Sequence, residues 1–324
     1  MRACFSSIEI GPYKPDVEFE GAYTLWERNF GRQWPITLGI FREVTEAVHS
    51  RVETYQLAAR DQTGRLIGYL GSQLRPRKDT EASLLLLMVD PQCQRQGIGT
   101  KLLQAALEKF ENEKIATIHL GANAALPFWP GIPSGLPVAR AFFAKHGWQF
   151  YEESYDLMMD LREFAPPDWV SERPRQHGMD IRPAALEDVP ALYRYLEAEF
   201  PAWRRWFVHE LEVRGPKGIV VAGKGSQVVG ALLLSDSSSP DWTGRQWRTF
   251  LGEDMGALGT VCVRESERNQ GIGLAMVALA SQILRDRGVR NCFVHWTWLV
   301  DWYGKLGYKV WQEYWMAKKV MRES

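Results

Sequence analysis

Two short segments of the sequence combine polar side chains with closely spaced glycines. Residues 94–99 read QRQGIG, and residues 268–273 read RNQGIG. Glycine lets the backbone approach a ligand closely, because no β-carbon is in the way. The first amides of a helix that follows such a turn have no partner within the helix and lie at the positive end of its dipole. Each segment therefore predicts a turn that could hold a phosphate or pyrophosphate group.

Other phosphate-binding loops match these segments less well. A dinucleotide-binding fingerprint would need a third glycine where Leu102 and Met276 stand. A Walker loop would need Gly-Lys-Ser/Thr, whereas residues 97–101, GIGTK, have threonine and lysine in the opposite order. The six-residue pattern alone is weak, and a turn that only packs a helix on a strand remains the alternative.

The flanks of the two turns repeat as well, which indicates an internal duplication. Residues 83–110 align with 256–284, IATIHLG (115–121) with NCFVHWT (291–297), and FFAKHGWQFYEE (142–153) with WYGKLGYKVWQE (302–313). A chain of 324 residues also favours two domains. Residues 163–178 are rich in proline and polar side chains, which predicts a linker between the two domains. The expected division is 1–162, a linker at 163–178, and 179–324.

Each half predicts the same order of elements. A helical stretch (19–49 or 186–214) comes first. A strand pair follows, with a turn at Thr63-Gly64 in the first half. Next come a buried strand, the glycine turn and a helix, then another strand, a short helix and a terminal strand pair. The expected strands lie at 53–75 (a pair), 84–89 and 115–120 in the first half, and at 219–222, 228–234, 258–263 and 291–296 in the second.

On these two turns and their shared Lys-x-Gly-aromatic tails, the chain resembles the GCN5-related N-acetyltransferase (GNAT) family, as a tandem pair covering nearly its whole length. The resemblance implies an α/β fold of two GNAT-like domains, each a mixed, mostly antiparallel twisted sheet flanked by helices. It implies acetyl-CoA between the strand before the turn and the next strand. The residues it assigns to the cofactor are Val89, Gln94, Arg95, Gln96, Gly97, Ile98, Gly99 and Thr100, and Val261, Val263, Arg268, Asn269, Gln270, Gly271, Ile272 and Gly273.

Acetyl transfer to an amine needs a base, an oxyanion donor and an acid for the departing thiolate. The resemblance implies a backbone N–H on the strand before the turn as the donor. It implies a tyrosine two residues before the lysine of the tail as the acid. That residue is Tyr303 in the second half but Phe143 in the first, and a phenyl ring donates no proton. We therefore expect chemistry in the C-terminal half, although Tyr303 as a core aromatic is the alternative.

The candidate bases are Glu253 and Asp254, just before the strand 258–263, where the family often places a carboxylate. Glu81 would be their match in the first half. His295 lies on the next strand and aligns with His119. A histidine repeated within a chain is more often structural than a base, so His295 remains open.

Two insertions distinguish the halves, residues 121–137 in the first and 235–256 in the second. Long loops with aromatic residues are usually functional or disordered. We expect the second insertion to form a wall of the acceptor site, lined by Trp242, Trp247 and Phe250, with a solvated loop as the alternative. Trp296 stands where many family members have an asparagine that helps hold pantetheine.

The composition limits the remaining possibilities. Lys plus Arg and Asp plus Glu each number 39, so no basic excess points to nucleic acid. No segment predicts a signal peptide or a membrane span, and the four cysteines lack zinc-type spacing. We expect a cytoplasmic monomer or homodimer without a metal, which moves an acetyl group to a small-molecule or peptide amine by direct attack in a ternary complex. The N-terminal half would be degenerate or bind CoA only. The alternatives are a non-catalytic acyl-CoA sensor, or catalysis in both halves.

Overall fold

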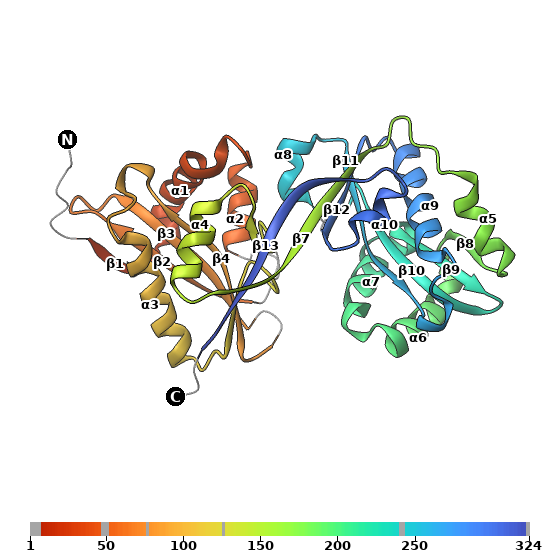
Figure 1. Ribbon diagram of the computed structural model, residues 1–324, viewed down its shortest axis with the longest axis horizontal. Helices are drawn as coiled ribbons and strands as arrows, with labels where there is room; N and C mark the ends of the chain where they lie inside the picture. Colours follow the sequence, from red (N-terminus) through yellow and green to blue (C-terminus); the bar gives the residue numbers. More distant parts are fainter. Residues whose placement is uncertain (1–7, 47–51, 76–77, 125–126, 240–243, 322–324) are drawn as a thin grey trace. The chain divides into compact units, whose positions relative to one another are not determined.

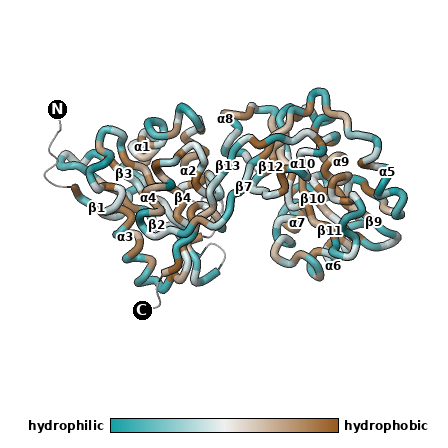
Figure 2. Tube along the Cα trace, in the orientation of Figure 1, coloured by the Kyte–Doolittle hydropathy of each residue, from teal (hydrophilic) through white to brown (hydrophobic). Residues whose placement is uncertain are grey.

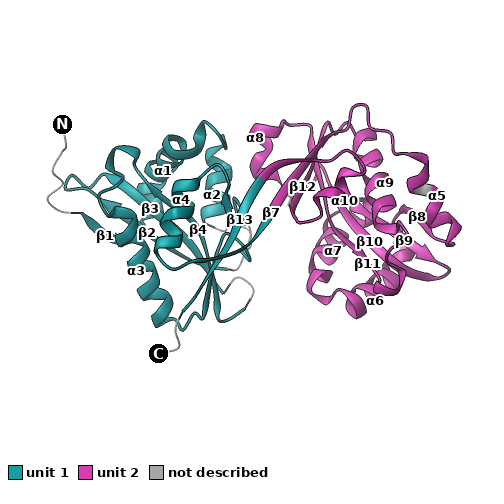
Figure 3. Cartoon of the chain, in the orientation of Figure 1, with its two compact units in different colours: residues 1–154, 313–324 teal, residues 155–312 magenta. Residues whose placement is uncertain are grey.

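The computed structural model describes residues 8–46, 52–75, 78–124, 127–239 and 244–321. The chain forms two compact units, residues 1–154 with 313–324 (unit 1) and residues 155–312 (unit 2), coloured separately in Figure 3. These boundaries differ from the division at 163–178 that the repeat suggests. That division describes the repeats themselves and remains a prediction.

Unit 1 contains the elements predicted for the first half (Figure 1). The predicted pair at 53–75 is an antiparallel hairpin, with Gly64 at a φ of +80° in its turn. The elements are β1 (Glu9–Pro12), α1 (Pro15–Trp26), the π-helical turn η1 (Glu27–Gly31), α2 (Leu38–Glu46), β2 (Glu53–Arg60), β3 (Leu66–Leu74), β4 (Glu81–Val89), η2 (Pro91–Cys93), α3 (Ile98–Asn112), β5 (Thr117–Leu120), β6 (Ile132–Pro133), α4 (Pro137–Lys145) and the start of β7 (Gln149–Asp160).

Unit 2 repeats this order. The residues expected as a linker contain a helix, α5 (Asp168–Gln176), and Phe164 and Val170 lie in the core of unit 2. The other elements are β8 (Asp180–Pro183), η3 (Leu186–Asp188), α6 (Val189–Glu199), α7 (Pro201–Arg214), η4 (Gly215–Gly218), β9 (Ile219–Lys224), β10 (Gln227–Ser235), η5 (Arg245–Trp247), α8 (Arg248–Leu251), β11 (Met255–Val263), η6 (Glu265–Glu267), α9 (Ile272–Asp286), β12 (Asn291–Thr297), α10 (Val300–Gly304) and the start of β13 (Lys309–Val320).

Each unit has a mixed, mostly antiparallel sheet, as predicted. In unit 1 the order is β1-β2-β3-β4-β5, and in unit 2 it is β8-β9-β10-β11-β12. The only parallel neighbours among these described strands are β4 with β5 and β11 with β12. The two parallel pairs therefore occupy matching places in the repeat.

The terminal strand of each repeat completes the sheet of the other unit. Residues 157–160 of β7 pair with β12, and residues 318–320 of β13 pair with β5. The predicted terminal strand pairs are instead two single strands of 12 residues each. Neither strand contains glycine, proline or asparagine, three of the residues that most often form turns.

Hydrophobic stretches lie among the strands and their covering helices in both units (Figure 2). In unit 1, Leu102, Leu103 and Phe110 of α3 are buried against β2–β5. In unit 2, α9 covers one face of the sheet, while α6 and α7 contribute a second cluster with Ala231 and Cys262. The sheet of unit 2 is therefore covered on both faces.

The insertion at 121–137 closes the interior of unit 1 instead of lining an open surface. Phe128 and Trp129 are 0% and 6% exposed. Their rings contact Trp26 at centroid distances of 4.4 and 5.3 Å, and Trp129 contacts Trp34 at 5.0 Å. The aromatic side chains of α1 and of the insertion thus form one buried cluster.

Two further features concern membranes and metals. No helix in the described ranges is both long and apolar enough to cross a bilayer. Across those same ranges, no group of three or more His, Cys, Asp or Glu side chains is arranged to hold a metal ion.

Candidate active site

The two glycine turns have the same backbone conformation. Gly97 and Gly271 precede α3 and α9 with φ values of +83° and +82°, and Arg95 and Asn269 both have a φ of +63°. A positive φ is unfavourable for most residues with a β-carbon, so glycine is favoured at Gly97 and Gly271. A β-carbon at Gly97 would meet nothing within 4 Å, which leaves open space in front of the helix. Both turns fit an anion held by helix N-terminal amides.

The side chains of Gln94 and Arg268 hold these turns by hydrogen bonds to the backbone. The Gln94 amide donates to the carbonyl of Val89, and the Arg268 guanidinium donates to the carbonyl of Val263, each at 3.2 Å. Each bond ties the turn back to the last residue of the preceding strand. The shared polar position therefore has a shared structural role.

The other predicted cofactor residues divide into buried and accessible ones. Ile98 and Ile272 are 1% exposed and anchor their helices in the cores, and Val89, Val261 and Val263 pack against those cores. A β-carbon at Gly99 would lie 3.7 Å from Phe142, and one at Gly273 would lie 3.1 Å from Trp302. The remaining members of the two turns lie at or near the surface, Gln96, Thr100 and Gln270.

Beside each turn the two parallel strands part. Pairing of β11 with β12 covers 255–258 and 291–294, and pairing of β4 with β5 covers 81–84 and 117–120. Beyond Leu258, β11 continues beside β10 only. A register shift there sets Thr260, which has a φ of +51°, and Val261 against the single residue Leu232. A β-carbon at Gly259 would meet nothing within 4 Å, so this backbone borders open space.

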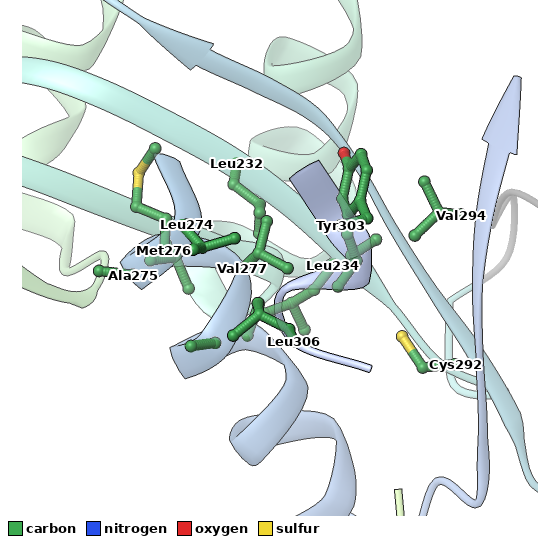
Figure 4. Packing of buried hydrophobic residues seen from close by; sticks show 14 of the residues in the cluster. Leu232, Leu234, Leu274, Ala275, Met276, Val277, Cys292, Val294, Tyr303 and Leu306 are labelled. Carbon is green, nitrogen blue, oxygen red and sulfur yellow. The ribbon is translucent and has the colours of Figure 1, made fainter. Parts of the chain in front are cut away.

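Tyr303 approaches from α10 and is 5% exposed. Figure 4 shows its ring among side chains of β10, α9 and β12, including Leu234, Val277 and Val294. Burial raises the pKa of the Tyr303 hydroxyl above its ordinary value, and the nearby Cys292 thiol adds to this shift when ionised. The hydroxyl has no hydrogen-bond partner among the described residues. It is thus a protonated donor that is not engaged elsewhere in the described chain.

His295 lies just past the point where β11 and β12 part, and it is held by a buried carboxylate. Its Nδ1 is 2.9 Å from Oδ1 of Asp156, whose side chain is fully buried, while the histidine is 17% exposed. The backbone N–H of Trp296, at a φ of +50°, donates to the same oxygen at 2.8 Å. Because a carboxylate only accepts, the bond places a proton on Nδ1 and leaves the Nε2 lone pair of the neutral ring available.

The match between His295 and His119 is wrong by two residues. His119 lies opposite Ser83, whereas the residue opposite Ala257, the counterpart of Ser83, is Phe293. By this register the counterpart of His295 is Gly121. The similar Ile-His and Val-His pairs gave the incorrect alignment. His295 is therefore not a repeated structural feature.

Unit 1 lacks all three side chains of this arrangement. Phe143 replaces Tyr303, and a β-carbon at Gly121 would lie 2.0 Å from the Trp129 carbonyl oxygen, so no side chain fits there. In the equal-length strands β7 and β13, the counterpart of Asp156 is Met316, whose sulfur accepts from Ser154. The insertion fills the place that His295 has in unit 2.

Glu253 and Asp254 lie at the opposite end of β11 from the glycine turn. Glu253 forms an ion pair with Arg248 and its side chain is 77% exposed. Asp254 borders a pocket with Asp236 and Arg287. Neither carboxylate contacts Tyr303 or His295 in the described chain. Glu81 likewise forms a salt bridge at the start of β4, with Lys78.

The part of the insertion 235–256 that contains η5 and α8, residues 245–251, lies on the same face of the sheet as His295. Cys292 and Val294 point into the α9 core, so Phe293 and His295 point to the other face. There Trp247 and Phe250 contact Trp311 at 5.8 and 5.6 Å, and Phe293 stacks on His295 at 5.9 Å. Phe250 is 46% exposed, whereas Trp247 is buried. Trp242 lies outside the described residues.

Sequence reasoning missed two residues at this site, Asp156 and Arg173. The Arg173 guanidinium of α5 donates to the carbonyl of Asn269 at 2.8 Å, and a β-carbon at Gly271 would lie 3.6 Å from Arg173 Cδ. The only signal for Arg173 was the arginine content of residues 163–178. Asp156 had none, because its strand was assigned to its own half.

Two strand–turn–helix units with parting parallel strands define the chain as a tandem α/β fold of two GNAT-like halves. The model of the acetyltransferase (GNAT) family matches residues 19–129 and 182–308, and the chain belongs to this family. The resemblance that the sequence suggested is confirmed, and acetyl-CoA is the acetyl donor of this family.

Several relatives match most of the chain. It is 29% identical to a mycothiol acetyltransferase of Mycobacterium ulcerans over 271 residues, 78% of this chain and 75% of that protein. It is 25% identical to the mycothiol acetyltransferase of Cellulomonas flavigena over 250 residues. The aligned region is 71% of this chain and 63% of that protein. The chain thus spans less than two thirds of that relative.

Solved structures give the same picture. A GCN5-related glucosamine N-acetyltransferase region in a fungal multi-domain GH3 β-N-acetylglucosaminidase is 28% identical, with a TM-score of 0.87. It covers 97% of this chain and 38% of that one. A tandem GNAT protein from the clavulanic acid biosynthesis pathway has a TM-score of 0.63 at 15% identity and supports the fold alone, over 98% of this chain and 100% of that one.

Proposed function

We propose that this protein is an acetyl-CoA-dependent N-acetyltransferase whose active centre lies in unit 2, while unit 1 is structural or binds CoA without turnover. The carrying observation is the set of matched replacements. Tyr303, His295 and Asp156 occur in unit 2 where unit 1 has Phe143, Gly121 and Met316, although both glycine turns are intact. This pattern fits one catalytic centre and one degenerate copy.

Acetyl-CoA supplies the acetyl group as a thioester, and the proposal assigns the proton transfers to two side chains. His295 Nε2 accepts the proton that the acceptor amine loses as its nitrogen forms the new C–N bond. Backbone N–H groups of β11 near Thr260 stabilise the oxyanion. As the C–S bond breaks with its electron pair on sulfur, Tyr303 donates its proton to the thiolate. The products are the amide and free CoA, and both side chains are reset by proton exchange with solvent.

We propose an amino sugar of the glucosamine class as the acceptor. The support is the glucosamine N-acetyltransferase activity named for the fungal region, together with its 28% identity across 97% of this chain. The acetyltransferase relatives named for mycothiol also favour a small-molecule amine. Ring contacts run from His295 through Phe293 and Trp311 to Phe250, which is 46% exposed, and such an aromatic surface suits the apolar face of a sugar ring.

The test is CoA release with acetyl-CoA and a panel of glucosamine, an amino acid, a polyamine, and peptides that carry an N-terminal amine or a lysine. We expect turnover with glucosamine first and a loss of turnover in Tyr303→Phe. Tight CoA binding without turnover on any amine would overturn the enzyme assignment. Preference for a peptide would overturn only the acceptor class. Equal loss of activity from disrupting Gly97 and Gly271 would overturn the division between the units.

A further inference from the structure

The best-supported new feature is the carboxylate behind His295. Asp156 is fully buried, and its Oδ1 receives two bonds, from His295 Nδ1 at 2.9 Å and from the Trp296 N–H at 2.8 Å. A buried carboxylate is costly unless it is hydrogen-bonded. These bonds supply that compensation, and they fix the ring by its far nitrogen.

The position of Asp156 on β7 explains how it reaches this place. Pairing of β7 with β12 is regular from Asn291 to Val294, then shifts before Thr297 pairs with Tyr155. His295 and Trp296 occupy the irregular step, where Trp296 has a φ of +50°. At this bulge the N–H of Trp296 donates to the Asp156 side chain instead of to the backbone of β7. The same contact therefore holds the backbone bulge and the imidazole.

We propose that Asp156 is the positioning residue of the catalytic base, and that the first repeat supplies it to the active centre of the second. This inference rests on the proposed function, in which His295 accepts the proton of the amine. The carboxylate keeps the proton on Nδ1, leaves the Nε2 lone pair available to the amine, and stabilises the imidazolium that forms. Asp156 acts through His295 and does not contact the substrate. The second repeat alone, residues 179–324, does not contain the residue.

Asp156→Asn in the full chain is the appropriate substitution. An asparagine has nearly the same shape, and its carbonyl oxygen can still accept from Trp296 and His295, so the bulge is retained. Only the negative charge that stabilises the imidazolium is lost. We expect kcat to fall roughly ten- to hundredfold, with the KM for acetyl-CoA unchanged within about twofold. Asp160→Asn, on the same strand but at the surface beside Arg162, is the matched control and should leave kcat unchanged.

A double-mutant cycle separates positioning from a general structural role. Because Asp156 acts through His295, Asp156→Asn should slow His295→Ala no further. Exogenous imidazole should restore part of the activity of His295→Ala. Additive losses, or a fall in melting temperature that accounts for the loss in Asp156→Asn, would overturn the inference.

The outcomes also separate this inference from the proposed function. If the wild-type protein acetylates no amine, the proposed function is wrong. If the wild type is active and Asp156→Asn keeps full kcat, only the role of Asp156 is wrong. In ¹⁵N NMR of the full chain, neutral His295 should carry its proton on Nδ1, and a proton on Nε2 would contradict the assigned bond.

Discussion

Oδ1 of Asp156 and Nδ1 of His295 lie 2.9 Å apart, although 139 residues separate them in the chain. The first belongs to the last strand of one repeat and the second to a central strand of the other. Because β7 pairs with β12, the Asp156 side chain reaches the imidazole of His295. The two repeats therefore contribute unequally but jointly to one site.

Replacing His295 tests the base directly. His295→Ala should lower kcat roughly 10²- to 10⁴-fold, because no other described side chain occupies the same place. The KM for acetyl-CoA should change little, since the glycine turn is untouched. Steady-state CoA release measures both constants. Unchanged kcat in this variant would remove His295 from the mechanism.

Tyr303→Phe removes one hydroxyl that has no hydrogen-bond partner in the described chain. Stability should therefore change by less than about 1 kcal/mol, because no bond is broken and the ring stays buried. We expect kcat to fall roughly 10²-fold if the hydroxyl protonates the thiolate. Phe143→Tyr in unit 1 is the mirrored control and should restore nothing when combined with Tyr303→Phe.

The glycine turns should respond differently to alanine. Gly271→Ala and Gly97→Ala place a β-carbon at nearly identical φ values, so each should cost about 1–2 kcal/mol of backbone strain. Only the first should raise the KM for acetyl-CoA in turnover, because only unit 2 is proposed to react. Isothermal titration calorimetry with CoA would show directly whether Gly97→Ala abolishes CoA binding to unit 1 that does not lead to turnover.

Arg173 should contribute to the shape of the turn in unit 2. Arg173→Ala removes the hydrogen bond to the Asn269 carbonyl and a positive charge next to the glycine turn that is proposed to hold the pyrophosphate. We expect weaker acetyl-CoA binding, by about three- to tenfold, with kcat unchanged at saturation. The matched control is Arg175→Ala on the same helix. An equal effect of both variants would point to the net charge of α5 instead of this contact.

Gly121→Ala should destabilise unit 1. A β-carbon there would meet the Trp129 carbonyl at 2.0 Å, and the residue has a φ of +75°. We expect a loss of more than about 2 kcal/mol in the free energy of unfolding. Gly64→Ala, at a φ of +80° with nothing within 4 Å, isolates the backbone cost. Equal losses in denaturant titrations would contradict the steric argument.

Local sequence patterns predicted the turns, the strands beside them and the helices that follow, because these depend on nearby glycines and hydrophobic periodicity. The pairing of β7 with β12 was out of reach, since a strand carries no local mark of which sheet it joins. That is why Asp156 was missed. The two-residue error at His119 has a related cause, because register is a property of neighbouring strands and residue similarity is a poor guide to it.

Glu253 and Asp254 show a second limit of prediction from sequence, the position of a residue along a strand. They are close in sequence to the strand that carries the site, yet a strand of nine residues is about 30 Å long and has two ends. Sequence proximity did not say which end would matter. His295 came from the adjacent strand, at the point where parallel pairing stops.

The crossing of β7 and β13 also sets the order in which the protein can be completed during synthesis. The outer edge of β5 stays open until residues 318–320, which follow all of unit 2 in the sequence, have left the ribosome. An exposed strand edge is a template for unwanted pairing. The sheet of unit 1, although begun first, is therefore completed only after all of unit 2 has been synthesised, and until then that edge is open to other proteins in the cell.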